Sequence, residues 1–249
     1  MSTLALSCLI FVLILGGILL GTLLRRALPE HHLSEDSQDV VRLGTGLIGT
    51  IAALVLGLLI AAAKSSFDTQ STQITQITAD LILIDNLLAE YGPEARPIRE
   101  QMRSGIGPWV DQLWREKQAS SATPFEANAS AEQVYLAVHA LSPQNDLQRS
   151  LQARAAQISN DLVQTRFLLF AESGNVIPTP FLVILVLWLV IIFASFSLFS
   201  DLNGTVFTCL SLFAGSASCA IFLILELSQP FSGLMMISSE PLRHALAPL

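Results

Sequence analysis

The chain has 249 residues, of which 52% are hydrophobic and only 13% charged, and its formal net charge is −7. A soluble domain usually carries about 25% charged residues, so this composition excludes an ordinary soluble enzyme. The acidic balance gives no support for nucleic-acid binding. The shortage of charge is concentrated in four runs that lack Lys, Arg, Asp, Glu and His, at 4–24, 43–63, 181–199 and 205–225. Each run has about the 20 residues that cross a bilayer as a helix.

The first run is expected to be a retained span and not a signal peptide. A signal peptide has a basic start, a shorter apolar stretch and a cleavage site with small residues. Here residues 1–3 carry no basic side chain, the run is too long, and Arg25 and Arg26 follow it. The predicted fold class is therefore all-α, an integral membrane protein with four spans.

The loop at 25–42 and the cysteines offer little for metal chemistry. His31 and His32 precede Glu35 and Asp36 at a spacing that would place them together on a helix and hold a divalent cation. A solvated polar loop is the commoner reason for such clustering, and it is the interpretation adopted. The three cysteines all lie inside apolar runs and include no C-x-x-C pair. We therefore expect no metal site and no disulfide.

The second run is the most informative of the four. Small residues recur along one face at spacings of three and four, with a threonine beside them: Gly46, Gly49, Thr50, Ala53, Gly57 and Ala61. Such a stripe permits close packing between membrane helices. It would equally suit the wall of a narrow pore, where small apolar side chains leave room for ions. The sequence leaves both interpretations open, so these residues are candidates for pore lining or helix packing.

The polar segment 64–177 is predicted to form an extramembrane helical bundle. Apolar residues step by three and four in a heptad pattern: Ile74, Ile77, Leu81, Ile84, Leu88 and Tyr91. The same register continues back into the second run, and no Pro or Gly lies between Lys64 and Tyr91, which predicts one helix from the membrane to Tyr91, ended by Gly92 and Pro93. This seam would pack within the chain or against another subunit.

Further helices are expected along the rest of this segment. One spans 94–117, with a kink or interruption at Gly105, Gly107 and Pro108. Residues 119–130 are rich in Ser, Ala and Thr and suggest a loop. Ser142 and Pro143 resemble a helix start, which would open a helix that leads towards the third span.

The end of the fourth span carries a short group of distinctive residues. Glu226 closes the span, Pro230 ends the helix, and Gly233 permits a turn. Phe231 is expected to anchor in the lipid headgroup region. No ionisable side chain lies deeper in any span, which disfavours transport coupled to protons. The chain also lacks G-x-S-x-G, H-E-x-x-H, P-loop and G-x-G-x-x-G motifs, so we expect neither an enzyme nor a cofactor.

Several of these features together resemble a bacterial membrane family of unknown function that is grouped with the bestrophins. The resemblance rests on Arg-Arg-x-Leu-Pro at 25–29, the Gly-rich second span leading to Phe67, Pro-Thr-Pro at 178–180, and the C-terminal motif with Glu226, Pro230, Phe231, Ser232 and Gly233, followed by Ser-Glu-Pro at 239–241. Family members often carry an acid and a base before the Pro-Phe pair, where this chain has Ser228 and Gln229.

The resemblance implies a ring of five subunits around an anion pore lined by the second span. It also implies that the helical domain lies in the cytoplasm, whereas the Arg25–Arg26 pair beside the first span favours a cytoplasmic loop at 25–42. Sidedness therefore stays open. No acidic calcium-binding clasp like that of animal bestrophins is visible in the sequence.

The sequence as a whole predicts a multi-pass protein of the bacterial plasma membrane with four segments. These are a first transmembrane hairpin at 1–63, a helical domain at 64–177, a second hairpin at 178–227 and a tail at 228–249. The leading hypothesis is a bestrophin-like homo-oligomeric channel that passes small ions, anions above all. The alternative is a non-conducting scaffold or sensor whose helical domain binds a protein partner. Lipid is the other expected partner.

Overall fold

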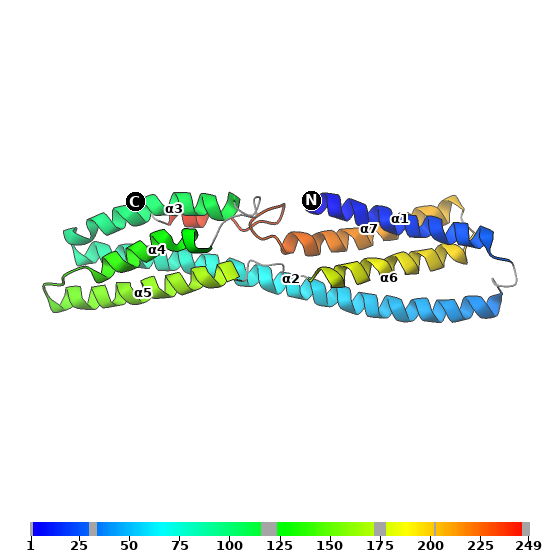
Figure 1. Ribbon diagram of the computed structural model, residues 1–249, viewed down its shortest axis with the longest axis horizontal. Coiled ribbons are helices and arrows are strands. Elements are labelled where there is room, and N and C mark those ends of the chain that lie inside the picture. The colour runs from blue at the N-terminus through cyan, green and yellow to red at the C-terminus, as the bar shows by residue number, and fades with distance from the viewer. Residues whose placement is uncertain (1, 30–33, 116–123, 172–177, 202, 246–249) are drawn as a thin grey trace. The chain divides into compact units, whose positions relative to one another are not determined.

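A computed structural model describes residues 2–29, 34–115, 124–171, 178–201 and 203–245 (Figure 1). Within these ranges all regular structure is helical, as predicted. The chain divides into two compact units. Unit 1 contains Met1–Ser65 and Asn175–Ser228, and unit 2 contains Ser66–Gly174 and Gln229–Leu249.

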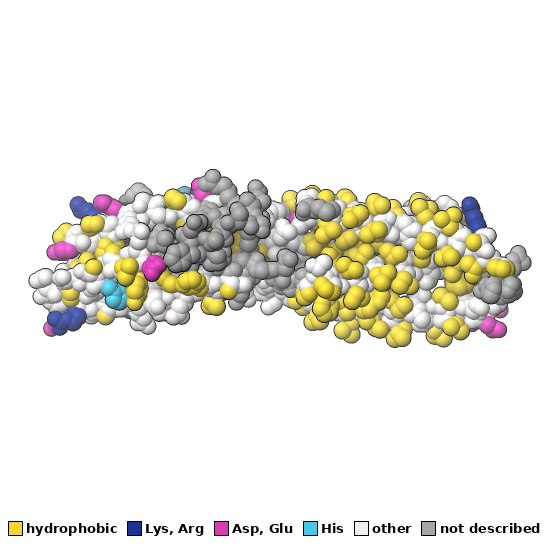
Figure 2. Space-filling view, viewed as in Figure 1, with side chains coloured by type: hydrophobic (Ala, Val, Ile, Leu, Met, Phe, Trp, Pro, Cys, Tyr) yellow, Lys and Arg dark blue, Asp and Glu magenta, His cyan; other side chains and the backbone are white. Residues whose placement is uncertain are grey.

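Unit 1 is built from the four apolar runs. They form α1 (Thr3–Ala27), the first part of α2 (Glu35–Tyr91), α6 (Thr179–Leu198) and α7 (Gly204–Leu227). Among the described residues, these four helices are long and apolar enough to cross a membrane, which confirms the predicted spans. Hydrophobic side chains are dense on the surface of this unit (Figure 2). Such a surface is stable in lipid because the acyl chains are as apolar as the side chains they cover.

Small residues bring the helices of unit 1 together. A Cβ built on Gly17 would lie 2.8 Å from the carbonyl oxygen of Val190, and one on Gly21 would collide with that of Ala194. The helices α1 and α6 therefore touch backbone to backbone, as Gly-x-x-x-Gly spacing allows. The Ser218 hydroxyl donates a hydrogen bond of 2.7 Å to the Ser7 carbonyl, which joins α7 to α1.

Helix α2 is continuous over 57 residues, which confirms one helix leading from the second span to Tyr91. It ends there because Gly92 takes a φ of 129°, a conformation that favours glycine and terminates helices. Its start was not predicted, since Glu35 lies well before the apolar run. Glu35 and Asp36 occupy its first turn, where carboxylates favour the helix dipole. They are therefore helical and not part of a loop, while His31 and His32 lie outside the described residues.

Unit 2 is a helical bundle with a contiguous hydrophobic core. It contains the second part of α2, a 3-10 turn η2 (Pro93–Ala95), α3 (Arg96–Arg115), α4 (Pro124–His139), α5 (Asp146–Ala171) and α8 (Glu240–His244). All six seam residues, Ile74, Ile77, Leu81, Ile84, Leu88 and Tyr91, are at most 7% exposed and belong to this core. The seam therefore packs within the chain.

The structure differs from three local expectations for this unit. Helix α3 is not interrupted at Gly105, Gly107 or Pro108 but continues through them, because the helix buries Trp109 and Val110 in the core and packing outweighs propensity. Helix α4 already begins at Pro124, inside the expected loop. Helix α5 begins at Asp146, and its cap is Asn145, whose side-chain oxygen accepts from the Gln148 backbone N–H at 2.8 Å.

Polar side chains tie the ends of these helices together. The Gln148 amide donates to the Tyr91 carbonyl at 2.9 Å, and the Gln152 amide donates to the Leu141 carbonyl at 2.7 Å. The Asp85 carboxylate of α2 accepts two hydrogen bonds from Arg99, at 2.8 and 2.9 Å, and one from Arg103 at 3.1 Å. The hydrogen bonds from Arg99 are the largest cause of a lowered pKa of Asp85. This cluster fixes α3 against α2.

Candidate functional site

The small-residue stripe of α2 makes no close helix contact with the part of the chain that the structure describes. Gly46, Thr50, Ala53, Gly57 and Ala61 are exposed, and Gly49 is half-buried. A Cβ placed on any of the three glycines would meet no heavy atom of the described residues within 4 Å. This contrasts with Gly17 and Gly21 of α1, whose added Cβ atoms would collide with α6.

A different face of α2 packs within the chain. Thr45, Ala52 and Leu59 are at most 7% exposed and recur every seven residues. At 3.6 residues per turn, this face lies about a third of a turn from the stripe. The stripe is thus left on the outside of a single subunit, where a second copy, lipid or a water-filled pore would cover it.

A groove of about 450 Å³ runs beside the N-terminal end of the stripe. Helix α2 lines it with Gly46, Gly49 and Thr45, and α6 lines it mainly with apolar residues such as Phe196. The Gln38 amide reaches across it to the Phe199 carbonyl at 3.5 Å. The glycines leave this space open because they have no side chain to fill it.

The stripe itself carries no charge. None of its side chains is ionisable, and the Thr50 hydroxyl donates to the Gly46 carbonyl at 2.9 Å. An uncharged surface of this kind does not coordinate ions tightly.

The C-terminal motif is divided between the two units. In unit 1, Glu226 is 2% exposed and accepts a hydrogen bond from the Thr3 hydroxyl. In unit 2, Phe231 is 1% exposed, inside the hydrophobic core. The expected headgroup anchor at Phe231 is therefore wrong, because the helical domain supplies an apolar site that sequence position alone does not reveal.

Phe231 is held by an aromatic partner and a closed loop. Its ring meets that of Trp114 edge to face, with centroids 5.1 Å apart. The Trp114 indole N–H donates to the Ile237 carbonyl at 3.1 Å, and the Ile237 N–H donates to the Pro230 carbonyl at 2.7 Å. Gly233 takes a φ of 93° within this loop, which a side chain would strain. Ser232 completes the turn, its N–H donating to the Gln229 carbonyl at 3.1 Å.

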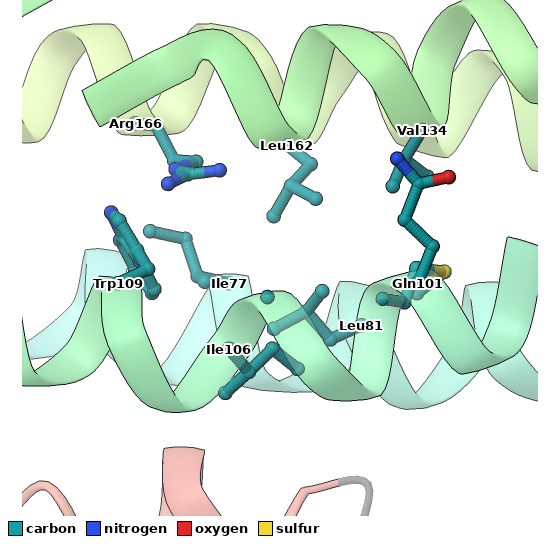
Figure 3. A pocket seen from close by; sticks show the side chains of 10 residues that line it. Ile77, Leu81, Gln101, Ile106, Trp109, Val134, Leu162 and Arg166 are labelled. Carbon is teal, nitrogen blue, oxygen red and sulfur yellow. The ribbon is translucent and has the colours of Figure 1, made fainter. Parts of the chain in front are cut away.

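A buried arginine in unit 2 was not foreseen. Arg166 of α5 is 7% exposed, and its guanidinium lies 4.2 Å from the ring centroid of Trp109. Figure 3 shows Arg166 and Leu162 facing Trp109 and Ile106 across a cavity of about 40 Å³. Burial lowers the pKa of Arg166 to about 10, so it stays protonated at neutral pH. The sequence did hold a signal for this burial: Arg166 lies four residues after Leu162 and three before Leu169, a spacing that places the three on one helix face.

Comparisons with known proteins agree with this helical architecture. The family model of the bestrophin-like domain matches residues 12–242. The chain belongs to the bestrophin-like family. No curated protein matches it.

Solved structures share the fold of this bestrophin-like chain. Two of them are point mutants of a bacterial bestrophin homologue from Klebsiella pneumoniae. One is 15% identical with a TM-score of 0.69, covering 99% of this chain and 96% of that one. The other is 14% identical with a TM-score of 0.68, covering 95% and 96%. At this identity the likeness establishes the fold, and function must be argued from the residues.

Proposed function

We propose that this bestrophin-like protein is an oligomeric channel of the bacterial plasma membrane that conducts ions passively, anions in preference to cations. The observation that carries the proposal is the stripe from Gly46 to Ala61. It follows one face of a membrane-spanning helix, and its glycines have open space around them in the single chain. A symmetric ring, of five subunits by family resemblance, would bring five such faces around one axis.

The chemistry of the stripe supports passive flow of anions. The span at 43–63 has no ionisable side chain, so it has no group to couple ion movement to protons. It also has no carboxylate that would attract cations or repel anions. Small apolar walls do not replace a hydration shell, so large, weakly hydrated anions would cross at the lowest cost.

Bulky substitutions on the stripe test this proposal. Gly57→Trp and Gly49→Trp would fill the pore, whereas Gly44→Trp is a matched control on the same helix. Gly44 also has open space around it but lies off the stripe. We expect the first two variants to lose anion flux in liposomes at least tenfold, with the control near wild type. Native mass spectrometry of each variant confirms that the oligomer persists.

Two results would contradict the channel. Flux through Gly57→Trp equal to that of the control would show that the stripe does not line the pore. A wild-type protein that stays monomeric in lipid nanodiscs would leave no axis for a pore. A reversal potential in asymmetric chloride that follows the cation would keep the channel and reject anion preference.

The scaffold alternative has lost the observation that favoured it. Its support was the heptad seam as a surface for a protein partner. Ile77 and Ile84 are fully buried within the chain, so the seam is occupied by intrachain packing. We therefore do not carry it as a second candidate.

A further inference from the structure

The C-terminal segment forms a closed loop with an apolar tip. Its base is fixed in unit 2 by the 2.7 Å hydrogen bond from the Ile237 N–H to the Pro230 carbonyl, and by the burial of Phe231. The three residues of the tip are nevertheless exposed: Leu234 by 75%, Met235 by 42% and Met236 by 59%. Three neighbouring large apolar side chains on one loop tip are unusual for a surface in contact with water.

The composition of this loop matches a lipid interface. No charged side chain occurs between Glu226 and Glu240, so nothing in the loop opposes entry into a region of low polarity. The Gly233 φ of 93° turns the chain just before the tip. Methionine is flexible and apolar, which suits contact with disordered acyl chains.

The chain also keeps the tip near the membrane. The spanning helix α7 ends at Leu227, and the base of the loop begins at Pro230, three residues later. Leu234 follows Leu227 by seven positions along the chain, which limits their distance to about 24 Å even for an extended chain. The short connection therefore keeps the tip within reach of the membrane surface.

We propose that Leu234, Met235 and Met236 insert into the boundary between headgroups and acyl chains, so that the lipid surface is the partner of this loop. Because its base is part of the core of unit 2, the loop ties the helical domain to the membrane surface at a second point, besides the chain connections. Apolar side chains at this depth bind by burial of their surface. This proposal does not depend on ion conduction.

Site-directed spin labelling of the full-length protein tests this contact. Cys8, Cys209 and Cys219 are replaced by Ala, and a nitroxide is attached at Met236→Cys in phospholipid nanodiscs. Leu234→Cys is a second labelled position in case the first fails to fold. The matched water reference is Ser142→Cys, an exposed position of the helical domain. Power saturation with oxygen and with a water-soluble nickel chelate then measures the environment.

We expect the ratio of oxygen to nickel collision rates to be at least threefold higher at the tip than at Ser142→Cys. A ratio equal to that reference would place the tip in water and overturn the proposal. Low collision rates with both reagents, together with dipolar broadening between labels, would show that the tip packs against another copy. That result would overturn it as well.

Discussion

The burial of Phe231 leads to a quantitative prediction about the C-terminal motif. Its side chain is 1% exposed and packs edge to face on Trp114 at 5.1 Å. Phe231→Ala would remove the ring from a closed site and leave a cavity. Substitutions of this kind cost about 3–5 kcal/mol, and the loss of an aromatic pair places this one in the upper half, about 4–5 kcal/mol.

Urea unfolding in mild detergent measures this loss, with far-UV circular dichroism and tryptophan fluorescence as the two probes. With a slope of about 2 kcal/mol per molar, the midpoint should fall by roughly 2 M. Phe167→Ala is the matched control, because Phe167 lies in the same unit but is 51% exposed. We expect the control to change stability by less than about 1 kcal/mol.

The reasoning would be refuted if the two variants unfolded at the same urea concentration. Phe231 would then contribute no more than a surface residue, as an anchor in the headgroup region would. A loss in Phe231→Ala that is absent in detergent and appears only in lipid would likewise indicate an anchor at the membrane surface.

Further predictions concern three sites outside this motif. Asp85→Asn should destabilise the helical unit by about 2–3 kcal/mol, since it removes the counter-charge of Arg99. Because the pKa of Asp85 is lowered, the full loss should be seen above pH 3.8 and should vanish as the pH falls through the pKa of the folded state. Urea midpoints measured across this pH range test both statements. Asp80 has a raised pKa, mainly through burial, so Asp80→Asn should be more stable than wild type at pH 7, with the gain fading as the pH falls towards 3.8 in the same titration. Gly21→Val should lower the melting temperature in detergent, at a cost of about 1–3 kcal/mol, because its Cβ would collide with α6, whereas Gly16→Val, whose Cβ meets nothing, should not.

Periodicity and composition determined much of the architecture. The four uncharged runs predicted the spans, because a bilayer sets both the length and the apolarity of a helix that crosses it. The seam from Ile74 to Tyr91 predicted one long helix, since heptad spacing has few other structural meanings. Gly92 and Pro93 predicted where it ends, because glycine terminates helices and proline cannot continue them.

Local patterns failed where tertiary packing outweighed them. Pro108 lies inside a helix because the turns around it bury core residues. The helix start belongs to Asn145 and not to Ser142, since both residue types cap well and only the path of the chain chooses between them.

The candidate site shows most clearly what sequence spacing determines and what only tertiary contacts decide. The sequence by itself determined that Gly46, Gly49 and Gly57 share one face, because helical spacing fixes that face. Only the tertiary structure decided that this face is left open by the described residues of the chain, while Gly17 and Gly21 of α1 pack against α6. Likewise, the sequence placed Phe231 just after a span, but only folding brought Trp114, far away in the chain, to enclose it. Spacing fixes which residues lie together on one element; which elements meet depends on contacts between distant parts of the chain.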